Sequence, residues 1–254
     1  MDTVLPILPG LSRPAILARV ATTPGKSAEA VVRRSRGRPS VPVEKIVATA
    51  LQIVDEQGAD ALSMRTLAQR MDSGTATLYR HFANRAELVA QVIDLVYGSV
   101  EVDIERLRAM SWQEAIKAAA QAMFDSLREH ANVAPLFVDQ FPVGPNAMVQ
   151  RERLIALLLD NGFAPKLAAR SYATLAHYVL GFVAQLEGRT TATETGDTRP
   201  PTQFGGLDHD LFPATATVAR HLPVPLGDEF EFGLDLIIGG LSQLVDAEHP
   251  RPAR

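Results

Sequence analysis

The feature that most restricts the fold of this chain is an apolar spacing of three and four residues, which recurs from residue 44 to residue 247. Such spacing places apolar side chains on one face of a helix, whereas a half-buried strand requires strict alternation. No segment shows a convincing alternating pattern. The sequence therefore predicts an all-α protein.

The first 40 residues differ from the rest in composition. They contain five prolines and no sustained helical period, and they end in a basic run from Arg33 to Arg38. Residues 1 to 42 hold seven cations against Asp2 and Glu29, a net charge of +5 in a chain whose total is −4. We interpret residues 1–40 as a disordered basic tail or a misassigned start rather than a transit peptide. The net positive charge favours binding of a polyanion to this end of the chain.

Four helices are expected between residues 44 and 97. The first runs from Glu44 to Gly58, and the second is capped by Ser63 and ends near Met71. A turn of Asp72, Ser73 and Gly74 precedes a third, short helix at about 75–82. A fourth helix opens at Asn84, with Glu87 three residues later as in a capping box.

Two helices joined by a short glycine-containing turn describe a helix-turn-helix. At about 100° per residue, Leu78 and Phe82 lie on one side of the third helix, opposite the side chains of its polar face. Thr75 and Ala76 are short enough to approach base edges, and longer side chains reach phosphate oxygens. The predicted DNA contacts are Arg65, Thr75, Ala76, Tyr79, Arg80, His81 and Arg85.

Segment 44–97 resembles the DNA-binding domain of the tetracycline-repressor (TetR) family. The stretch from Thr77 to Phe82 reads Thr-Leu-Tyr-Arg-His-Phe, and Ala61 to Met71 resembles the family's second helix. The resemblance implies base contacts at the start of the third helix and phosphate contacts from Thr77, Tyr79, His81 and Arg85. The turn departs from the family's Gly-Val-Ser, because Asp72-Ser73-Gly74 lacks both the apolar residue and the serine cap.

Every convincing segment beyond Tyr97 is also helical. Helices are expected from Ser111, at 147–160, at 165–187, at 210–221 and at 228–247, and Thr190 to Gly206 reads as a flexible loop. Three glycines in the last helix reduce its propensity, so we expect close packing against another backbone there. They are Gly233, Gly239 and Gly240.

The region from about 111 to 247 resembles the sensor domain of the tetracycline-repressor subgroup in its order of helices and in its Gly144-Pro145-Asn146 segment. This resemblance implies a small-molecule effector, and no particular drug. The helices 165–187 and 228–247 are expected to pair with their copies in a homodimer. Apolar residues at helical spacing more often form plain core than a pocket. The candidate pocket residues are Phe124, Phe137, Phe141, Met148, His177 and Tyr178.

Several functional classes have no support in the sequence. The absence of cysteine excludes disulfides, thiolate metal ligands and a cysteine nucleophile. No hydrolase, phosphate-loop or zinc-protease motif occurs, and Asp208-His209-Asp210 reads as a polar loop. No apolar stretch reaches the roughly 18 residues of a membrane span. We expect no catalysis, no cofactor, no metal and a cytoplasmic location.

The sequence thus predicts a tail at 1–40, a helix-turn-helix domain at 41–97, an effector-binding and dimerisation domain at 98–248, and a short tail at 249–254. The expected function is a ligand-responsive transcriptional regulator. We expect it to be a repressor that leaves a palindromic double-stranded operator when a small molecule binds. An all-helical small-molecule binding protein without operator function remains the alternative.

Overall fold

The computed structural model describes residues 41–137, 140–194, 206, 208 and 210–248. Within these residues every regular element is a helix, as the sequence predicts. The chain from Val43 onward forms one compact unit. The tails expected at 1–40 and 249–254 lie outside the described residues.

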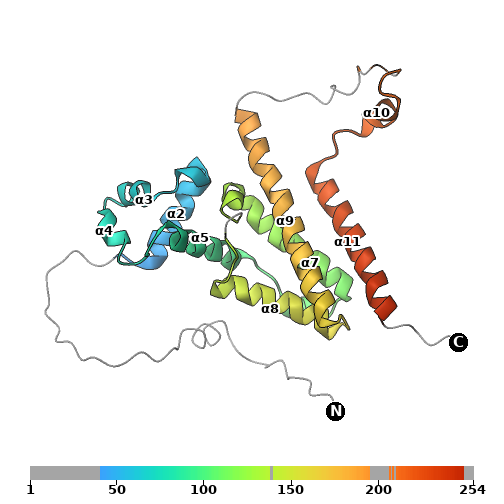
Figure 1. The fold of residues 1–254 in the computed structure, drawn as a ribbon, viewed down its shortest axis with the longest axis horizontal. Coiled ribbons are helices and arrows are strands. Elements are labelled where there is room, and N and C mark those ends of the chain that lie inside the picture. The colour runs from blue at the N-terminus through green and yellow to red at the C-terminus, as the bar shows by residue number, and fades with distance from the viewer. Residues whose placement is uncertain (1–40, 138–139, 195–205, 207, 209, 249–254) are drawn as a thin grey trace, which may run out of the picture. The chain divides into compact units, whose positions relative to one another are not determined.

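Apart from α4, the first helices follow the predicted boundaries closely (Figure 1). Helix α2 ends before Gly58, whose φ of 84° suits glycine, and Ser63 caps α3 by accepting a hydrogen bond from the backbone N–H of Thr66 at 3.0 Å. Asn84 caps α5 in the same way through Glu87. The elements are α2 (Val43–Gln57), the 3₁₀ turn η1 (Ala59–Ala61), α3 (Met64–Arg70), α4 (Thr75–Leu78) and α5 (Arg85–Ser99).

The remaining elements include two short ones that the sequence did not reveal, α6 and η2. Helix α7 begins at a complete capping box of Ser111 and Glu114, and the hydrogen bonds from Ser111 lower the pKa of Glu114. The elements are α6 (Ile104–Arg108), α7 (Trp112–Glu129), η2 (Ala131–Phe137), α8 (Pro145–Asp160), α9 (Pro165–Glu194), α10 (Pro213–Val218), η4 (Ala219–His221) and α11 (Leu226–Glu248).

Helix α9 is longer than expected and corrects the loop assignment at its end. It continues to Glu194, whereas a loop was expected from Thr190. Threonine disfavours a helix only weakly, and no glycine or proline stands between Gly188 and Gly196 to end it. Most of the expected loop, 195–205, lies outside the described residues.

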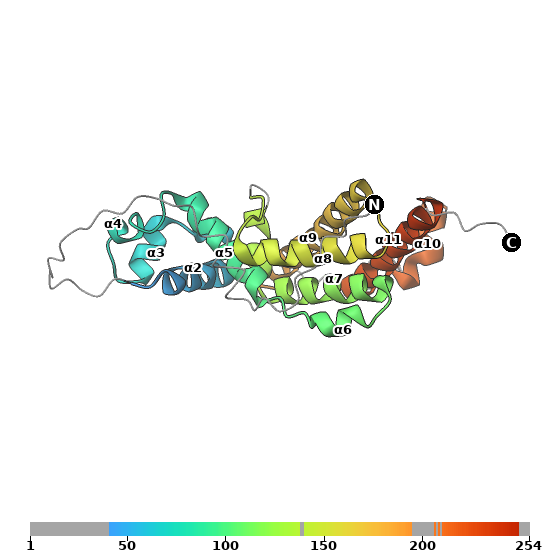
Figure 2. The same ribbon diagram turned by 90° about the horizontal axis from the view of Figure 1, so that it is seen from below.

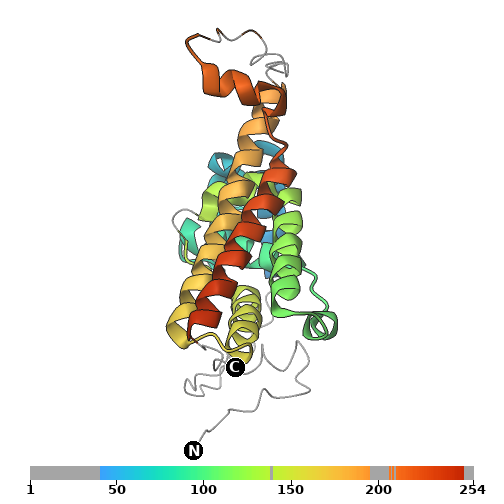
Figure 3. The ribbon, with the colours of Figure 1, turned by 90° about the vertical axis from the view of Figure 1, so that its right-hand side faces the viewer.

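Two groups of helices make up this unit. Figure 2 shows α2, α3 and α4 gathered at one end, with α5 between them and the remaining helices. The first group packs around buried apolar side chains that include Ile46, Ile53 and Leu67. In the second group, α7 packs against both α9 and α11, and the three helices run alongside one another in Figure 3.

An aromatic cluster holds α7, α9 and α11 together. Phe230 of α11 is fully buried and stacks on Phe124 of α7, with ring centroids 4.3 Å apart. Tyr178 and Phe182 of α9 lie 5.4 Å from the same ring. Burial of several aromatic rings in one layer is a major source of stability for a helical bundle.

The predicted glycine packing is only partly confirmed. A Cβ at Gly233 would overlap the hydroxyl of Tyr178, which donates a hydrogen bond to the carbonyl of Phe230 at 2.8 Å. The close neighbour is therefore a side chain, not a backbone. Gly239 and Gly240 meet no atom within 4 Å among the described residues of this chain.

The turn after α3 is a Schellman motif, in which two backbone N–H groups return to the end of the helix. Ser73 donates to the carbonyl of Ala68 at 2.9 Å, and Asp72 donates to Gln69 at 3.1 Å. Asp72 has the positive φ of 46° that this motif requires. The hydroxyl of Ser73 is buried, without a hydrogen-bond partner among the described residues.

The two serines around α3 give the first testable prediction. Ser73→Ala removes a buried hydroxyl that has no partner in the described part of the chain, so we expect the free energy of unfolding to rise by about 1 kcal/mol. Ser63→Ala removes a helix cap, and we expect a fall of about 1 kcal/mol. Urea unfolding followed by circular dichroism measures both. A loss of stability in both variants would contradict our account of the turn.

Candidate functional site

One face of α4 is anchored and the opposite face is open to solvent. Leu78 and Phe82 are buried, as predicted, and α4 packs against α3. Tyr79 is 55% exposed, and Thr75, Ala76 and Arg80 are exposed beside it. A short helix with this division can enter a groove without disturbing its own packing.

Helix α4 is shorter than the predicted 75–82, and this corrects the sequence assignment. Regular helix ends at Leu78, and residues 79–81 form turns. His81 donates to the carbonyl of Leu78 at 2.9 Å, an i→i+3 bond that tightens the chain before Phe82 returns to the core. His81 and Thr77 are half-buried, so their side chains reach outward less freely than Tyr79 and Arg80.

The start of α4 carries no side-chain cap. Gly74 occupies the N-cap position without a side-chain hydrogen bond, in agreement with the loss of the family's serine there. The first N–H groups of the helix lie in an exposed stretch, and Arg65 of α3 is exposed as well. Unpaired N–H groups at a helix start favour an anionic partner.

Arg85 lies where its sequence position predicts, at the first turn of α5, but its side chain turns toward the protein. Its Nε donates to the carbonyl of Leu62 at 2.7 Å, and a terminal nitrogen donates to Ala59 at 3.1 Å. These bonds tie α5 to the segment between α2 and α3. Sequence reasoning missed them because the acceptors are backbone atoms more than 20 residues away.

The six candidate pocket residues do not converge on one place. Phe124 and Tyr178 belong to the aromatic cluster around Phe230, and burial raises the pKa of Tyr178. Phe137 packs against Tyr97, with ring centroids 6.0 Å apart. The other three are exposed, namely Phe141, Met148 and His177.

Arg151 of α8 organises the region near Phe141 and Met148, a role that sequence reasoning missed. Its guanidinium lies 4.7 Å from the ring centroid of Phe141 and donates to the hydroxyl of Tyr172 at 3.1 Å. A third contact is the sulfur of Met148 at 2.8 Å. The sequence offered little signal for this role, because Arg151 lies in the polar run Gln150-Arg151-Glu152-Arg153. Nearby, burial raises the pKa of Tyr97 to about 12.

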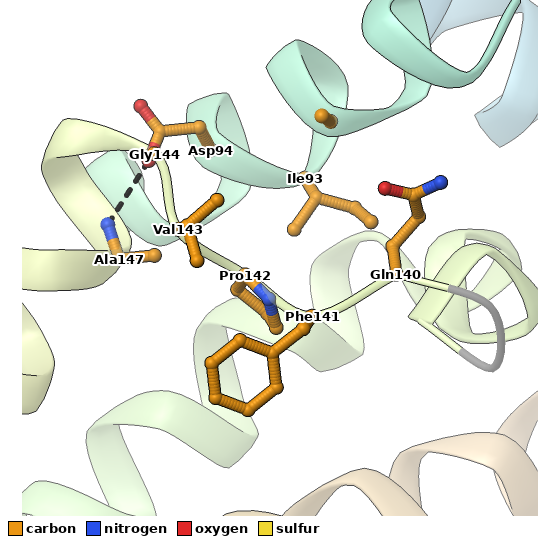
Figure 4. A pocket seen from close by; sticks show the side chains of 9 residues that line it. Ile93, Asp94, Gln140, Phe141, Pro142, Val143, Gly144 and Ala147 are labelled. Atoms are coloured by element: carbon orange, nitrogen blue, oxygen red, sulfur yellow. Dashed lines mark hydrogen bonds between the residues drawn. The ribbon is translucent and has the colours of Figure 1, made fainter.

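A shallow pocket lies between α5 and the segment that precedes α8 (Figure 4). Ala90, Ile93 and Asp94 line it from α5, and the chain from Gln140 to Gly144 lines it from the other side. Phe141 is the only candidate pocket residue among the residues that line it. Its walls are mainly apolar, with the Asp94 carboxylate at one edge.

Helix α11 presents an apolar face that nothing in the described part of this chain covers. Phe232 is 66% exposed and Leu236 is 62% exposed, and Gly239, Gly240 and Leu244 continue the face. On α9, the exposed residues His177, Gly181 and Ala184 follow the same spacing. Contiguous apolar surface of this kind marks an interaction site.

Metal and membrane sites find no support in the described ranges. Among the described residues, no three His, Asp or Glu side chains gather as a metal site would need. Asp208 instead accepts backbone hydrogen bonds from Asp210 and Leu211, as in a polar turn. None of the described helices combines the length and the apolar character that crossing a membrane would require.

Comparison with known proteins agrees with this architecture. Residues 46–92 match the model for bacterial regulatory proteins of the tetR family, and residues 107–245 match the model for the tetracyclin repressor-like C-terminal domain. The HTH-type transcriptional repressor DrrR1 of Streptomyces coeruleorubidus is 28% identical over 84% of this chain and 82% of its own length. Tetracycline repressor protein class E of Escherichia coli is 26% identical over 83% of this chain and 95% of the repressor.

Solved structures give the same result. Apo ActR of Streptomyces coelicolor superposes with a TM-score of 0.72 and 30% identity, covering 84% of this chain and all of ActR. ActR in complex with actinorhodin gives a TM-score of 0.68 and 33% identity, covering 80% of this chain and 96% of ActR. The C-terminal model alone spans more than half of the chain. The chain therefore belongs to the tetR family of bacterial regulatory proteins and is a DNA-binding regulator of transcription.

Proposed function

We propose that this chain is a repressor that binds a nearly palindromic operator as a homodimer and leaves it when a small molecule binds. In this proposal residues 41–97 read DNA and residues 98–248 sense the effector and dimerise, without catalysing a reaction. A cytoplasmic location follows from the operator as target. The observation that carries the proposal is the exposed face of α4 above the buried pair Leu78 and Phe82.

The proposed reading surface is built from α3 and α4. Thr75 and Ala76 begin α4 and are exposed, which supports base contact by short side chains. Tyr79 and Arg80 follow on the exposed side, where a hydroxyl and a guanidinium suit phosphate oxygens. We assign Arg65, Thr77 and His81 to the flanking phosphates. Arg85 contributes chiefly by fixing the start of α5, because its side chain already binds two carbonyls.

The exposed faces of α9 and α11 support a homodimer. Phe232, Leu236 and Leu244 expose apolar area that a second copy would bury, and Gly181, Gly239 and Gly240 would allow close helix approach. We assign His177 to this interface instead of the effector pocket, because it lies on the exposed side of α9. Two reading surfaces then meet successive major grooves about 34–36 Å apart.

The effector assignment rests on relatives and on the helices around α8. ActR has been solved with actinorhodin and with (S)-DNPA, which supports a small-molecule ligand for this chain. We propose that Phe141 and Met148, with Arg151, contact the effector. Phe124, Phe137 and Tyr178 make ring contacts elsewhere, and we assign them to core packing. The effector favours a dimer state whose reading surfaces no longer match the operator.

Footprinting of the DNA upstream of the protein's own gene tests the whole proposal. We expect protection of a nearly palindromic segment, and its loss with one member of a metabolite panel. A purified dimer that protects no fragment, yet binds a metabolite, would favour the alternative of an all-helical small-molecule binding protein.

The phosphate contact of Arg80 gives a second prediction. Arg80→Ala should weaken binding to all DNA sequences alike and flatten the plot of log K against log salt concentration by about 0.9. Arg108→Ala is the matched control, because Arg108 is an exposed arginine of α6 that pairs with Glu105. Fluorescence anisotropy over a salt series measures both variants. An unchanged slope for Arg80→Ala would remove its assigned role.

Base reading by Thr75 gives a third prediction. Thr75→Val keeps the shape of the side chain but removes its hydroxyl, so we expect altered preference at one operator position, worth about 1–3 kcal/mol. Affinity for non-specific DNA should not change. Binding to a library of single-base operator variants measures the effect. A uniform loss across the library would argue against a base contact.

The proposed interface gives a fourth prediction. Leu236→Glu places a charge within the apolar face of α11, so we expect a monomer in sedimentation at micromolar concentration and loss of operator binding. Leu211→Glu, at another exposed leucine before α10, is the control and should remain a dimer. Dimerisation of Leu236→Glu, or a monomeric parent protein, would contradict the proposed interface.

A further inference from the structure

A buried carboxylate joins the helix that follows the proposed reading surface to the start of α8. Asp94 of α5 is only 6% exposed. Its Oδ1 accepts a hydrogen bond from the backbone N–H of Ala147 at 3.0 Å, and its Oδ2 accepts one from Nδ2 of Asn146 at 3.0 Å. Figure 4 shows the carboxylate beside Ala147 and above the chain from Val143 to Gly144.

Asp94 thus caps a helix from a distance of about 50 residues in sequence. The N-cap residue of α8, Gly144, has no side chain to cap it, and Pro145 has no N–H. The first N–H groups of a helix need acceptors, and their partial positive charge attracts an anion. A buried carboxylate is stable only when it is hydrogen-bonded. The start of α8 therefore supplies donors to Asp94, and Asp94 supplies acceptors to the start of α8.

Helix α5 and the segment before α8 approach each other closely around this contact. A Cβ at Gly144 would overlap the Asp94 carboxylate. A Cβ at Gly98, one helical turn after Asp94, would lie 3.1 Å from Nδ2 of Asn146. Because glycines on both elements permit the approach, a small shift of residues 144–147 must either break the cap or carry α5 with it.

The same segment is held from the sensor side by Arg151. A terminal nitrogen of Arg151 donates to the carbonyl of Pro142 at 2.6 Å, while its guanidinium stacks on Phe141 and reaches Tyr172 of α9. One attachment of the segment is the Arg151 bond to Pro142, and the other is the Asp94 cap at residues 146 and 147. Between them, the shallow pocket separates the segment from α5. The Asp94 cap is therefore one of the links between α5 and the segment 141–147.

We propose that Asp94 is the coupling residue that transmits effector occupancy to the reading surface, with segment 141–147 as the moving element. An effector that competes for Arg151 or Phe141 displaces this segment. The displacement changes the Asp94 cap, and α5 then moves with Asn84 and α4 at its N-terminal end. The inference rests on the proposed function, because it assigns a regulatory contact to the same sensor.

The lack of cysteine in the chain allows a direct test. Cysteines at Gln69 of α3 and Asp160 of α8, both exposed, would carry spin labels that report the distance between the reading helices and the sensor. Labelled chain is mixed with excess unlabelled chain, so that only distances within one chain are recorded. Pulsed electron resonance then compares the full-length parent protein with its variants, without DNA or effector.

Two variants break the contact from opposite sides. Asp94→Ala removes the carboxylate, and Gly144→Ala keeps it but forces it away. Their controls are Gln91→Ala, at an exposed position of α5, and Gly227→Ala, where a Cβ meets no atom within 4 Å. Asp94→Asn, which retains one acceptor oxygen, replaces Asp94→Ala if that variant does not fold.

We expect both contact variants to shift or broaden the distribution of distances between residues 69 and 160, and the controls to match the parent. A second label pair at Glu152 of α8 and Lys166 of α9 should not change. Affinity for the footprinted operator should fall about tenfold without effector. A contact that served stability alone would lower the melting temperature and leave the 69–160 distances of the folded protein unchanged.

Unchanged 69–160 distances in Gly144→Ala and in the folded Asp94 variant would overturn the inference. The distance measurement does not depend on operator binding, so it separates the two claims. A parent protein that binds no DNA refutes the proposed function, whereas a DNA-binding parent whose contact variants keep both distances and operator affinity refutes only the role of Asp94.

Discussion

The burial of Leu78 and Phe82 is the constraint on which the reading surface depends. A helix of one regular turn has almost no stability of its own, so α4 persists because these two side chains fill the core beneath it. Their burial fixes the rotation of the helix and leaves Tyr79 and Arg80 outward. Arg85 adds a second restraint by binding the carbonyls of Ala59 and Leu62.

The sensor helices show a different balance between packing and exposure. Phe124, Tyr178 and Phe230 fill the interior between α7, α9 and α11, which makes these three helices one rigid layer. The outer face of α11 remains apolar and exposed at Phe232 and Leu236. A single chain therefore buries its aromatic core but leaves an apolar face of α11 exposed. This arrangement suits a subunit that associates through that face.

Several polar contacts join helices of the unit to one another, and two of them connect the two groups of helices. Asp94 caps α8 from α5, and Arg151 holds the chain before α8 against α9. His130, beyond the end of α7, contacts the carboxylate of Asp55 in α2 at 3.0 Å. Hydrogen bonds are directional and either made or broken, so such contacts suit an interface with two arrangements better than apolar packing does.

The sequence alone determined the helical class, the boundaries of α2 and α3, the capped starts of α5 and α7, and the outward face of α4, because these follow from local spacing and capping. Only the tertiary structure decided the inward turn of the Arg85 side chain, the separation of His177 from Phe124, and the cap that Asp94 provides. The Arg85 and Asp94 contacts join residues from about 20 to more than 50 positions apart. Their formation depends on how whole helices cross, and periodicity within one helix carries no information about that.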